Sequence, residues 1–161
     1  MDILVFLQKY IIFSDRLHLN KLSSKIFFIW VMIFLIDHNI RGQAVILLGT
    51  LAAEGWLDIL PVRFANFEEF GLSSDSDDRT VWRCAQINQL ILITANRSMK
   101  GKNSLEQTLR EENTPRSFPV ITIGSVDRLD EAKYRERCVT RIVEVALDID
   151  NYMGTGRIFV P

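Results

Sequence analysis

The sequence is poor in cysteine, histidine, glycine and proline, and each shortage excludes a class of protein. Its 161 residues include only 2 Cys, 2 His, 8 Gly and 4 Pro. The cysteines, Cys84 and Cys138, are too few for a disulfide scaffold and lack the spacing of metal ligands. The low glycine and proline contents disfavour collagen-like and low-complexity chains. We therefore expect one globular domain in a reducing, cytoplasmic setting.

An excess of charge of either sign is also missing. The 19 Lys and Arg nearly balance the 20 Asp and Glu, which leaves a formal net charge of -1. A generally basic surface for nucleic acid is therefore excluded, and any basic site must be local.

Long hydrophobic runs are absent, although the N-terminal region carries shorter ones at residues 3–13 and 26–36. A membrane-spanning helix needs about 20 apolar residues, so neither run predicts a stable membrane span. Met32 stands inside the second run, directly before a strand-like segment. One hypothesis is that residues 1–31 are a leader produced by a gene-model artefact and that residues 32–161 form the single domain. The alternatives are a membrane-surface helix or an extra core helix.

From residue 31 onward, short β-like runs alternate with helical patterns, which predicts a mainly parallel α/β sheet with helices on its faces. The predicted strands are residues 31–36, 57–64, 90–95 and 119–123, with an edge strand at 157–160. The predicted helices are residues 42–54, 78–88, 104–112 and 129–150, and residues 67–77 are predicted to form a loop.

Three polar residues are expected near the carboxyl ends of the strands, where such sheets place their ligands. Asp37 follows the first strand, Asn96 follows the third, and Asp78 lies in the first turn of the helix between them. Two carboxylates and an amide oxygen could hold Mg²⁺, which could activate water for attack on a phosphate. Each residue also has a structural alternative. The helix dipole alone would favour an acid at Asp78, Asp37 could cap a turn, and Asn96 could be an ordinary turn residue.

Short motifs around these positions resemble the compact bacterial PIN-like domain family, which includes toxin-type ribonucleases. The motifs are residues 33–40 (IFLIDHNI), Asp78 at the start of a helix, and residues 91–96 (ILITAN). The resemblance covers residues 32–126. It implies a Rossmann-like three-layer α/β/α sandwich with an acidic site that depends on Mg²⁺ or Mn²⁺ and cuts RNA.

The resemblance also implies roles for single residues. Asp37 matches the acid of the first strand, and Asp78 matches the acid that opens the later helix. Asn96 stands where the family usually has Asp, Ser98 where a second acid often follows, and His38 where Glu is frequent. Because these departures remove negative charge, two functions stay open. The first is a metal-dependent ribonuclease with Asp37, Asp78 and Asn96 as metal ligands. The alternative is a catalytically weakened PIN-like module acting in protein or nucleic-acid binding.

A local basic cluster, Arg97, Lys100 and Lys102, follows the third strand and could track a phosphate backbone. The alternative is a solvated loop. The expected partners are RNA, an antitoxin-like protein and a second copy of the chain. The apolar face of the last helix could serve such a protein contact or belong to the core. That face consists of Val139, Ile142, Val143, Ala146, Ile149 and Tyr152.

Overall fold

The computed structural model describes residues 31–98 and 101–161, so the predictions for residues 1–30 and for Lys100 lie outside it. Five strands form one parallel sheet in the order β2-β1-β3-β4-β5. The strands are β1 (Met32–Ile36), β2 (Val62–Ala65), β3 (Ile91–Thr94), β4 (Val120–Ile123) and β5 (Arg157–Val160). The α-helices are α2 (Arg41–Ala53), α3 (Asp78–Ile87), α4 (Leu105–Glu112), α5 (Ala132–Leu147) and α6 (Ile149–Tyr152). None of the described helices has the length and apolar character needed to cross a membrane.

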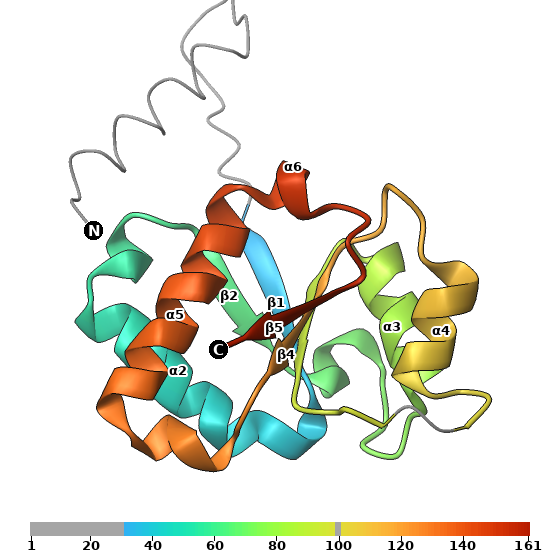
Figure 1. Ribbon diagram of the computed structural model, residues 1–161, viewed down its shortest axis with the longest axis horizontal. Coiled ribbons are helices and arrows are strands. Elements are labelled where there is room, and N and C mark those ends of the chain that lie inside the picture. Colours follow the sequence, from blue (N-terminus) through green and yellow to red (C-terminus); the bar gives the residue numbers. More distant parts are fainter. Residues whose placement is uncertain (1–30, 99–100) are drawn as a thin grey trace, which may run out of the picture.

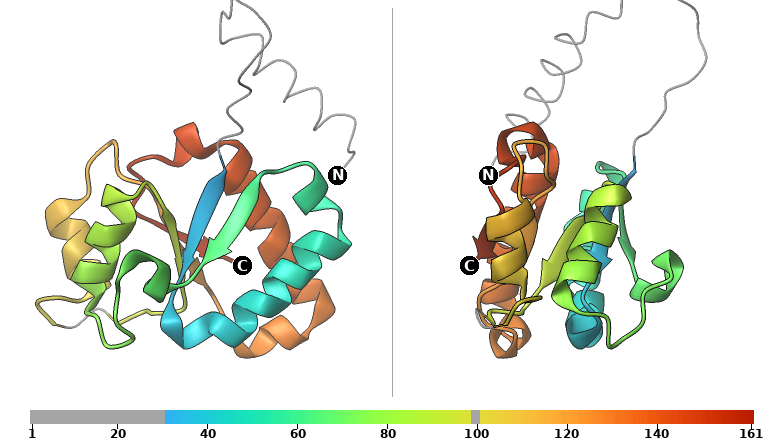
Figure 2. Two further views of the ribbon diagram at one scale, coloured as in Figure 1. Left: turned by 180° about the vertical axis from the view of Figure 1, so that it is seen from behind. Right: turned by 90° about the vertical axis from the view of Figure 1, so that its right-hand side faces the viewer.

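Helices cover both faces of the sheet, as Figures 1 and 2 show, so the domain is a three-layer α/β/α sandwich. The side chains of β1 alternate between the faces, as the two-residue period of a strand requires. Phe34 and Ile36 pack into the core formed with α2 and α5, whereas Leu35 packs into the core formed with α3 and α4. This arrangement confirms the predicted α/β fold with a parallel sheet.

The strand order places a topological switch point between β1 and β3. From β1 the chain passes through α2 to β2 on one side, and then through α3 to β3 on the other side of β1. The chain leaves β1 through α2 and leaves β3 through α4, and these two helices pack on opposite faces because they belong to different cores. A crevice at the carboxyl ends of two such strands is the general ligand position in open α/β sheets.

The predicted strand at residues 57–64 is wrong in its first half. Trp56–Asp58 forms a 3₁₀ turn, η2, after Gly55 ends the α2 region in a left-handed conformation with φ 76°. Leu60 is nevertheless buried, so an apolar residue in a turn produced the strand-like pattern. Pairing begins only at Val62, which lies opposite Met32.

Two further predictions also need correction. The loop predicted at residues 67–77 contains a 3₁₀ turn, η3 (Phe67–Phe70), which begins with a capping box formed by Asn66 and Glu69. The helix predicted over residues 129–150 is divided into η4 (Asp127–Asp130), α5 and α6. Glu131 interrupts it with an extended backbone, ψ 115°, which a continuous helix cannot contain.

The apolar face of the last long helix belongs to the core. Val139, Ile142, Val143 and Ala146 are each at most 9% exposed and pack in the same core as α2. This burial confirms the core interpretation, and it leaves these four side chains unavailable for a dimer or antitoxin contact. The edge strand predicted at residues 157–160 is present as β5, paired only with β4.

Candidate functional site

A small cavity of about 50 Å³ lies at the carboxyl ends of β1 and β3, at the switch point. Asp37 and Asp78 both line it, so the structure brings together the two acids that the sequence singled out. The other lining residues are Asn39, Phe67, Ser74, Ser76, Val81, Leu92, Thr94 and Leu105. The cavity therefore combines two carboxylates with several hydroxyl groups on an apolar base.

Asp37 follows β1 directly, and its own N–H donates to the carbonyl of Ile93 at 3.0 Å. Its Oδ1 accepts from the backbone N–H of Asn39 at 3.1 Å and caps the 3₁₀ turn η1 (His38–Ile40). Its Oδ2 accepts from the hydroxyl of Thr94 at 2.5 Å. Asp37 is thus both the cap of this turn and a lining residue of the cavity.

Thr94, the last residue of β3, fixes the orientation of Asp37. Its hydroxyl accepts the N–H of Asn96 at 2.9 Å, so its own proton is directed to Asp37. Thr94 is only 1% exposed, and both of its hydrogen bonds are partly buried. The sequence prediction missed this residue, although its position at the end of a buried strand beside Asn96 was a usable signal.

Asp78 is held by groups from two other segments. The side-chain amide nitrogen of Asn96 lies 2.9 Å from Oδ1 and 2.8 Å from Oδ2 of Asp78. The backbone N–H of Leu105, at the start of α4, donates to Oδ2 at 2.9 Å. The amide oxygen of Asn96 accepts from the N–H of Ser98 at 2.8 Å. Asn96 therefore turns a hydrogen-bond donor toward Asp78, whereas the sequence-based role as a metal ligand required its oxygen there.

A buried arginine from the C-terminal strand lies behind this cluster. Nη1 of Arg157 donates to the carbonyl of Asn96 at 2.8 Å and to the hydroxyl of Thr122 at 3.0 Å. Nη2 of Arg157 lies 3.9 Å from Glu106, and the arginine side chain is 10% exposed. Burial lowers the pKa of Arg157, while the nearby carboxylates of Glu106 and Asp78 oppose this shift. No local sequence pattern could have linked Arg157 to Asn96 across 61 residues.

The residues present fit one weakly held divalent cation better than a strong metal centre. Among residues 31–98 and 101–161, no cluster of three His, Cys, Asp or Glu side chains is arranged to hold a metal. An ionised carboxylate offers about four acceptor positions, and hydrogen bonds occupy most of those on Asp37 and Asp78. Each can still provide one oxygen. Mg²⁺ keeps several waters and can be bound through one or two carboxylates, so Asp37 and Asp78 fit such an ion.

The two described members of the predicted basic cluster, Arg97 and Lys102, do not gather at the acidic cavity. Arg97 is exposed, and its guanidinium donates to the carbonyl of Gly124 and lies over the ring of Phe159, 5.9 Å from the ring centre. Lys102 is also exposed, and its carbonyl accepts from Arg79 at 2.8 Å. Neither residue lines the cavity. Arg97 instead extends toward β5, the strand at the edge of the sheet.

The fold and the cavity together define a class: a doubly wound α/β protein with an acidic pocket at its switch point. No family model matches the chain, and no curated protein or solved structure matches it significantly. The geometry around Asp37, Asp78 and Asn96 is therefore the observation that bears on function.

Proposed function

We propose that this protein is a PIN-like, metal-dependent ribonuclease that holds a single Mg²⁺ or Mn²⁺ between Asp37 and Asp78. The observation that carries the proposal is the convergence of these two carboxylates, from β1 and α3, on one cavity at the switch point. A hard cation is the ligand that paired carboxylates beside hydroxyl groups select.

The chain positions both carboxylates before any ligand arrives. The Thr94 hydroxyl holds one oxygen of Asp37, and the Leu105 N–H holds one oxygen of Asp78. Such hydrogen bonds to the ligand residues fix their orientation. When bound, a divalent cation would supply an activated water and stabilise the leaving oxygen of a phosphodiester. Phe67, Val81 and Leu92 supply the apolar part of the cavity lining.

A second candidate function, RNA or protein binding without cutting, is favoured by one observation. The Asn96 amide nitrogen contacts both oxygens of Asp78. A hydrogen-bond donor in that position stabilises the carboxylate without a cation. Such a pocket can stay intact in a catalytically weakened PIN-like module.

RNA cleavage by the full chain distinguishes the two functions. A mixed pool of structured RNA is incubated with Mg²⁺, Mn²⁺ or EDTA and with Asp37→Asn, Asp78→Asn and Asp77→Asn. Asp77→Asn is the matched control, because Asp77 caps the same helix but does not line the cavity, and Asn is also a good cap. We expect metal-dependent cutting that is lost in the first two variants and kept in the control.

Other outcomes overturn the ribonuclease proposal. Cutting that persists in EDTA or in Asp78→Asn would place the activity elsewhere. RNA binding without any cutting by the folded protein would establish the weakened module instead. The antitoxin-like partner, the homodimer and the cytoplasmic location stay predictions of the resemblance and composition.

A further inference from the structure

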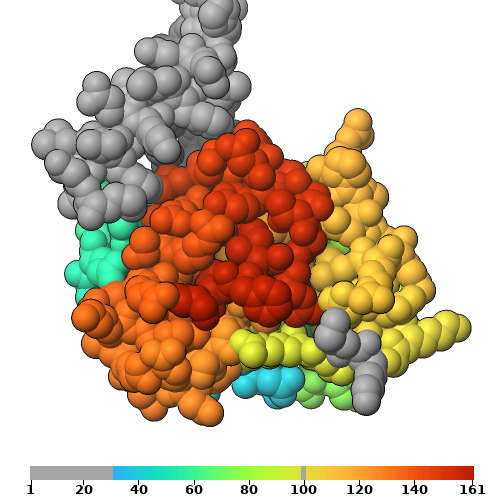
Figure 3. Space-filling model, viewed as in Figure 1, coloured from blue at the N-terminus to red at the C-terminus, as the bar shows by residue number. Residues whose placement is uncertain are grey.

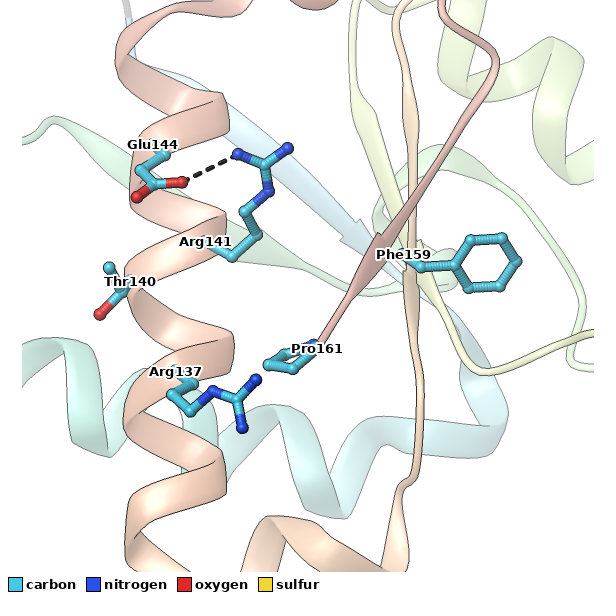
Figure 4. Close-up of a pocket in the computed structure, with 6 residues that line it drawn as sticks. All are labelled: Arg137, Thr140, Arg141, Glu144, Phe159 and Pro161. Atoms are coloured by element: carbon cyan, nitrogen blue, oxygen red, sulfur yellow. Dashed lines mark hydrogen bonds and ion pairs between the residues drawn. The ribbon is translucent and has the colours of Figure 1, made fainter.

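A second and larger hollow, about 360 Å³, lies between α5 and the edge strand β5, on the face of the molecule seen in Figure 3. Figure 4 shows its lining residues. It is lined by Arg137, Thr140, Arg141, Glu144, Phe159 and Pro161. We call it the edge groove. None of its lining residues belongs to the acidic cavity. Its volume lies in the range of small-molecule sites and is large enough for one nucleotide.

Phe159 lines the edge groove from β5. Its neighbours Ile158 and Val160 are buried, whereas Phe159 is 57% exposed. Figure 4 shows its ring projecting from β5 on the side away from α5. The guanidinium carbons of Arg97 and Arg157 lie 5.9 and 5.8 Å from the ring centre. An exposed aromatic ring beside guanidinium groups is a typical surface for stacking an unpaired base.

Two arginines line the groove from α5. Arg137 and Arg141 lie one turn apart on α5, and in Figure 4 both side chains extend from the helix toward β5. Arg141 pairs with Glu144 at 2.9 Å, but Arg137 has no ion-pair partner within residues 31–98 and 101–161. The groove is therefore cationic on a chain whose net charge is -1. This local charge complements a phosphate backbone.

The geometry of the strand edge disfavours an extended peptide as the occupant. The carbonyl of Gly156 accepts the N–H of Val120 in β4, and the carbonyl of Val160 accepts the N–H of Gly124, directly after β4. Because the backbone groups of successive strand residues point in alternate directions, those of Arg157, Phe159 and Pro161 point away from β4. Proline has no N–H, and the N–H of Arg157 already donates to Thr155 at 3.1 Å. Of these three residues, only Phe159 has an N–H available on the outer side. One donor is too few to pair an added peptide strand with β5.

We propose that a segment of single-stranded RNA binds across β5, with phosphates paired with Arg137 and Arg141 in the edge groove and one base stacked on the Phe159 ring, which projects beyond β5. The strand must be single because a paired base has no free face for the ring. Arg97 connects the groove to the acidic cavity, since it follows Asn96 directly and reaches Phe159. The inference deepens the proposed ribonuclease function by naming a substrate class, but binding in the groove needs neither the cation nor cutting.

The test measures the binding of a fluorescently labelled 12-nucleotide single-stranded RNA to the full chain in EDTA, by fluorescence anisotropy. We expect Phe159→Leu, which keeps an apolar side chain but removes the ring, to weaken binding by about fivefold or more. Phe159→Tyr, which keeps the ring, should bind as the parent does. The double variant R137Q/R141Q should weaken binding and reduce the log–log salt slope by about 0.7 per lost phosphate contact.

Arg63→Gln is the matched control for charge, because Arg63 lies on β2 at the opposite edge of the sheet. It should leave both the affinity and the salt slope unchanged. Thermal unfolding confirms that each variant is folded. Equal binding by Phe159→Leu and the parent, or equal affinity for a duplex, would overturn the inference. So would a homodimer that Phe159→Leu dissociates while RNA affinity stays unchanged.

The same RNA separates failure of this inference from failure of the proposed function. Asp37→Asn and Asp78→Asn should keep full binding in EDTA while they lose cutting in Mn²⁺. If RNA binding depends on Phe159 but the protein never cuts RNA, the edge-groove inference is supported and the ribonuclease proposal is refuted. If the protein cuts RNA and Phe159→Leu binds RNA as the parent does, the ribonuclease proposal is supported and the edge-groove inference is refuted.

Discussion

The side-chain nitrogen of Asn96 lies 2.8 and 2.9 Å from the two carboxylate oxygens of Asp78. An amide donor thus faces the acid at the centre of the candidate site, and Arg157 supports the same segment by donating to the Asn96 carbonyl. Hydrogen bonds from Asn96 and from the N–H of Leu105 therefore stabilise the Asp78 carboxylate. This relationship makes residue 96 the position where a single substitution should change the cation affinity most.

Replacing Asn96 with Asp should convert the pocket into a stronger cation site. Two carboxylates in direct contact repel each other, and the lost hydrogen bond adds about 1–3 kcal/mol of destabilisation in EDTA. Mn²⁺ should reverse the loss, because a ligand at about 100 times its Kd stabilises the native state by about 2.7 kcal/mol. Thermal unfolding with and without Mn²⁺ measures both effects. Asn96→Asp that is as stable as the parent in EDTA and does not respond to Mn²⁺ would refute the expectation.

Thr94→Val should destabilise the fold and disorient Asp37. The substitution keeps the shape but removes the hydroxyl that links the Asn96 N–H to Asp37. A buried polar group left without its partner costs about 1–3 kcal/mol. Urea unfolding measures the change, and Thr94→Ser, which keeps the hydroxyl, is the matched control. A loss of stability of equal size in both variants would mean that packing, and not the hydrogen bonds, explains the effect.

The sequence predicted the position of the acids better than the contacts around them. The apolar runs of β1, β3 and β4 indicate buried parallel strands, and the rule that such strands place ligands at their carboxyl ends located Asp37. The sequence also identified Asp78, because it predicted an acid in the first turn of the helix that leads into β3. These features depend on local pattern and on topology, both of which a sequence carries directly.

The remaining features depend on contacts between distant segments. The direction of the Asn96 amide is set by Ser98 and Asp78 together, and Arg157 reaches Asn96 from the far end of the chain. Residues 57–60 misled the strand prediction because apolar periodicity alone does not separate a short strand from a buried turn. Phe159 is exposed on the edge strand β5. The sequence predicted this edge strand, but it did not predict which strand β5 pairs with or which of its side chains are exposed.

Gly154→Ala should be much more damaging than Gly71→Ala. Both glycines have positive φ, 76° and 70°, so both substitutions strain the backbone by about 1 kcal/mol. A Cβ at Gly154 would also lie 2.7 Å from the Cα of Pro115, whereas a Cβ at Gly71 would meet nothing within 4 Å. The difference between the two melting temperatures isolates the clash. Because Gly154 leads into β5, Gly154→Ala should also weaken RNA binding in the edge groove, and unchanged stability and binding would contradict this account.

The two thiols should be inert at neutral pH, and the pH dependence of stability should reveal Cys138. Burial raises the pKa of Cys84, and it raises the pKa of Cys138 to about 11. The unfolded chain then loses the Cys138 proton at a lower pH than the folded protein does. Stability is therefore unaffected below the unfolded pKa near 9 and falls between pH 9 and 11, by up to about 1.4 kcal/mol per pH unit. Denaturant unfolding across this range, compared with Cys138→Ala, measures the contribution. A parallel pH dependence in the two proteins would show that Cys138 ionises equally in both states.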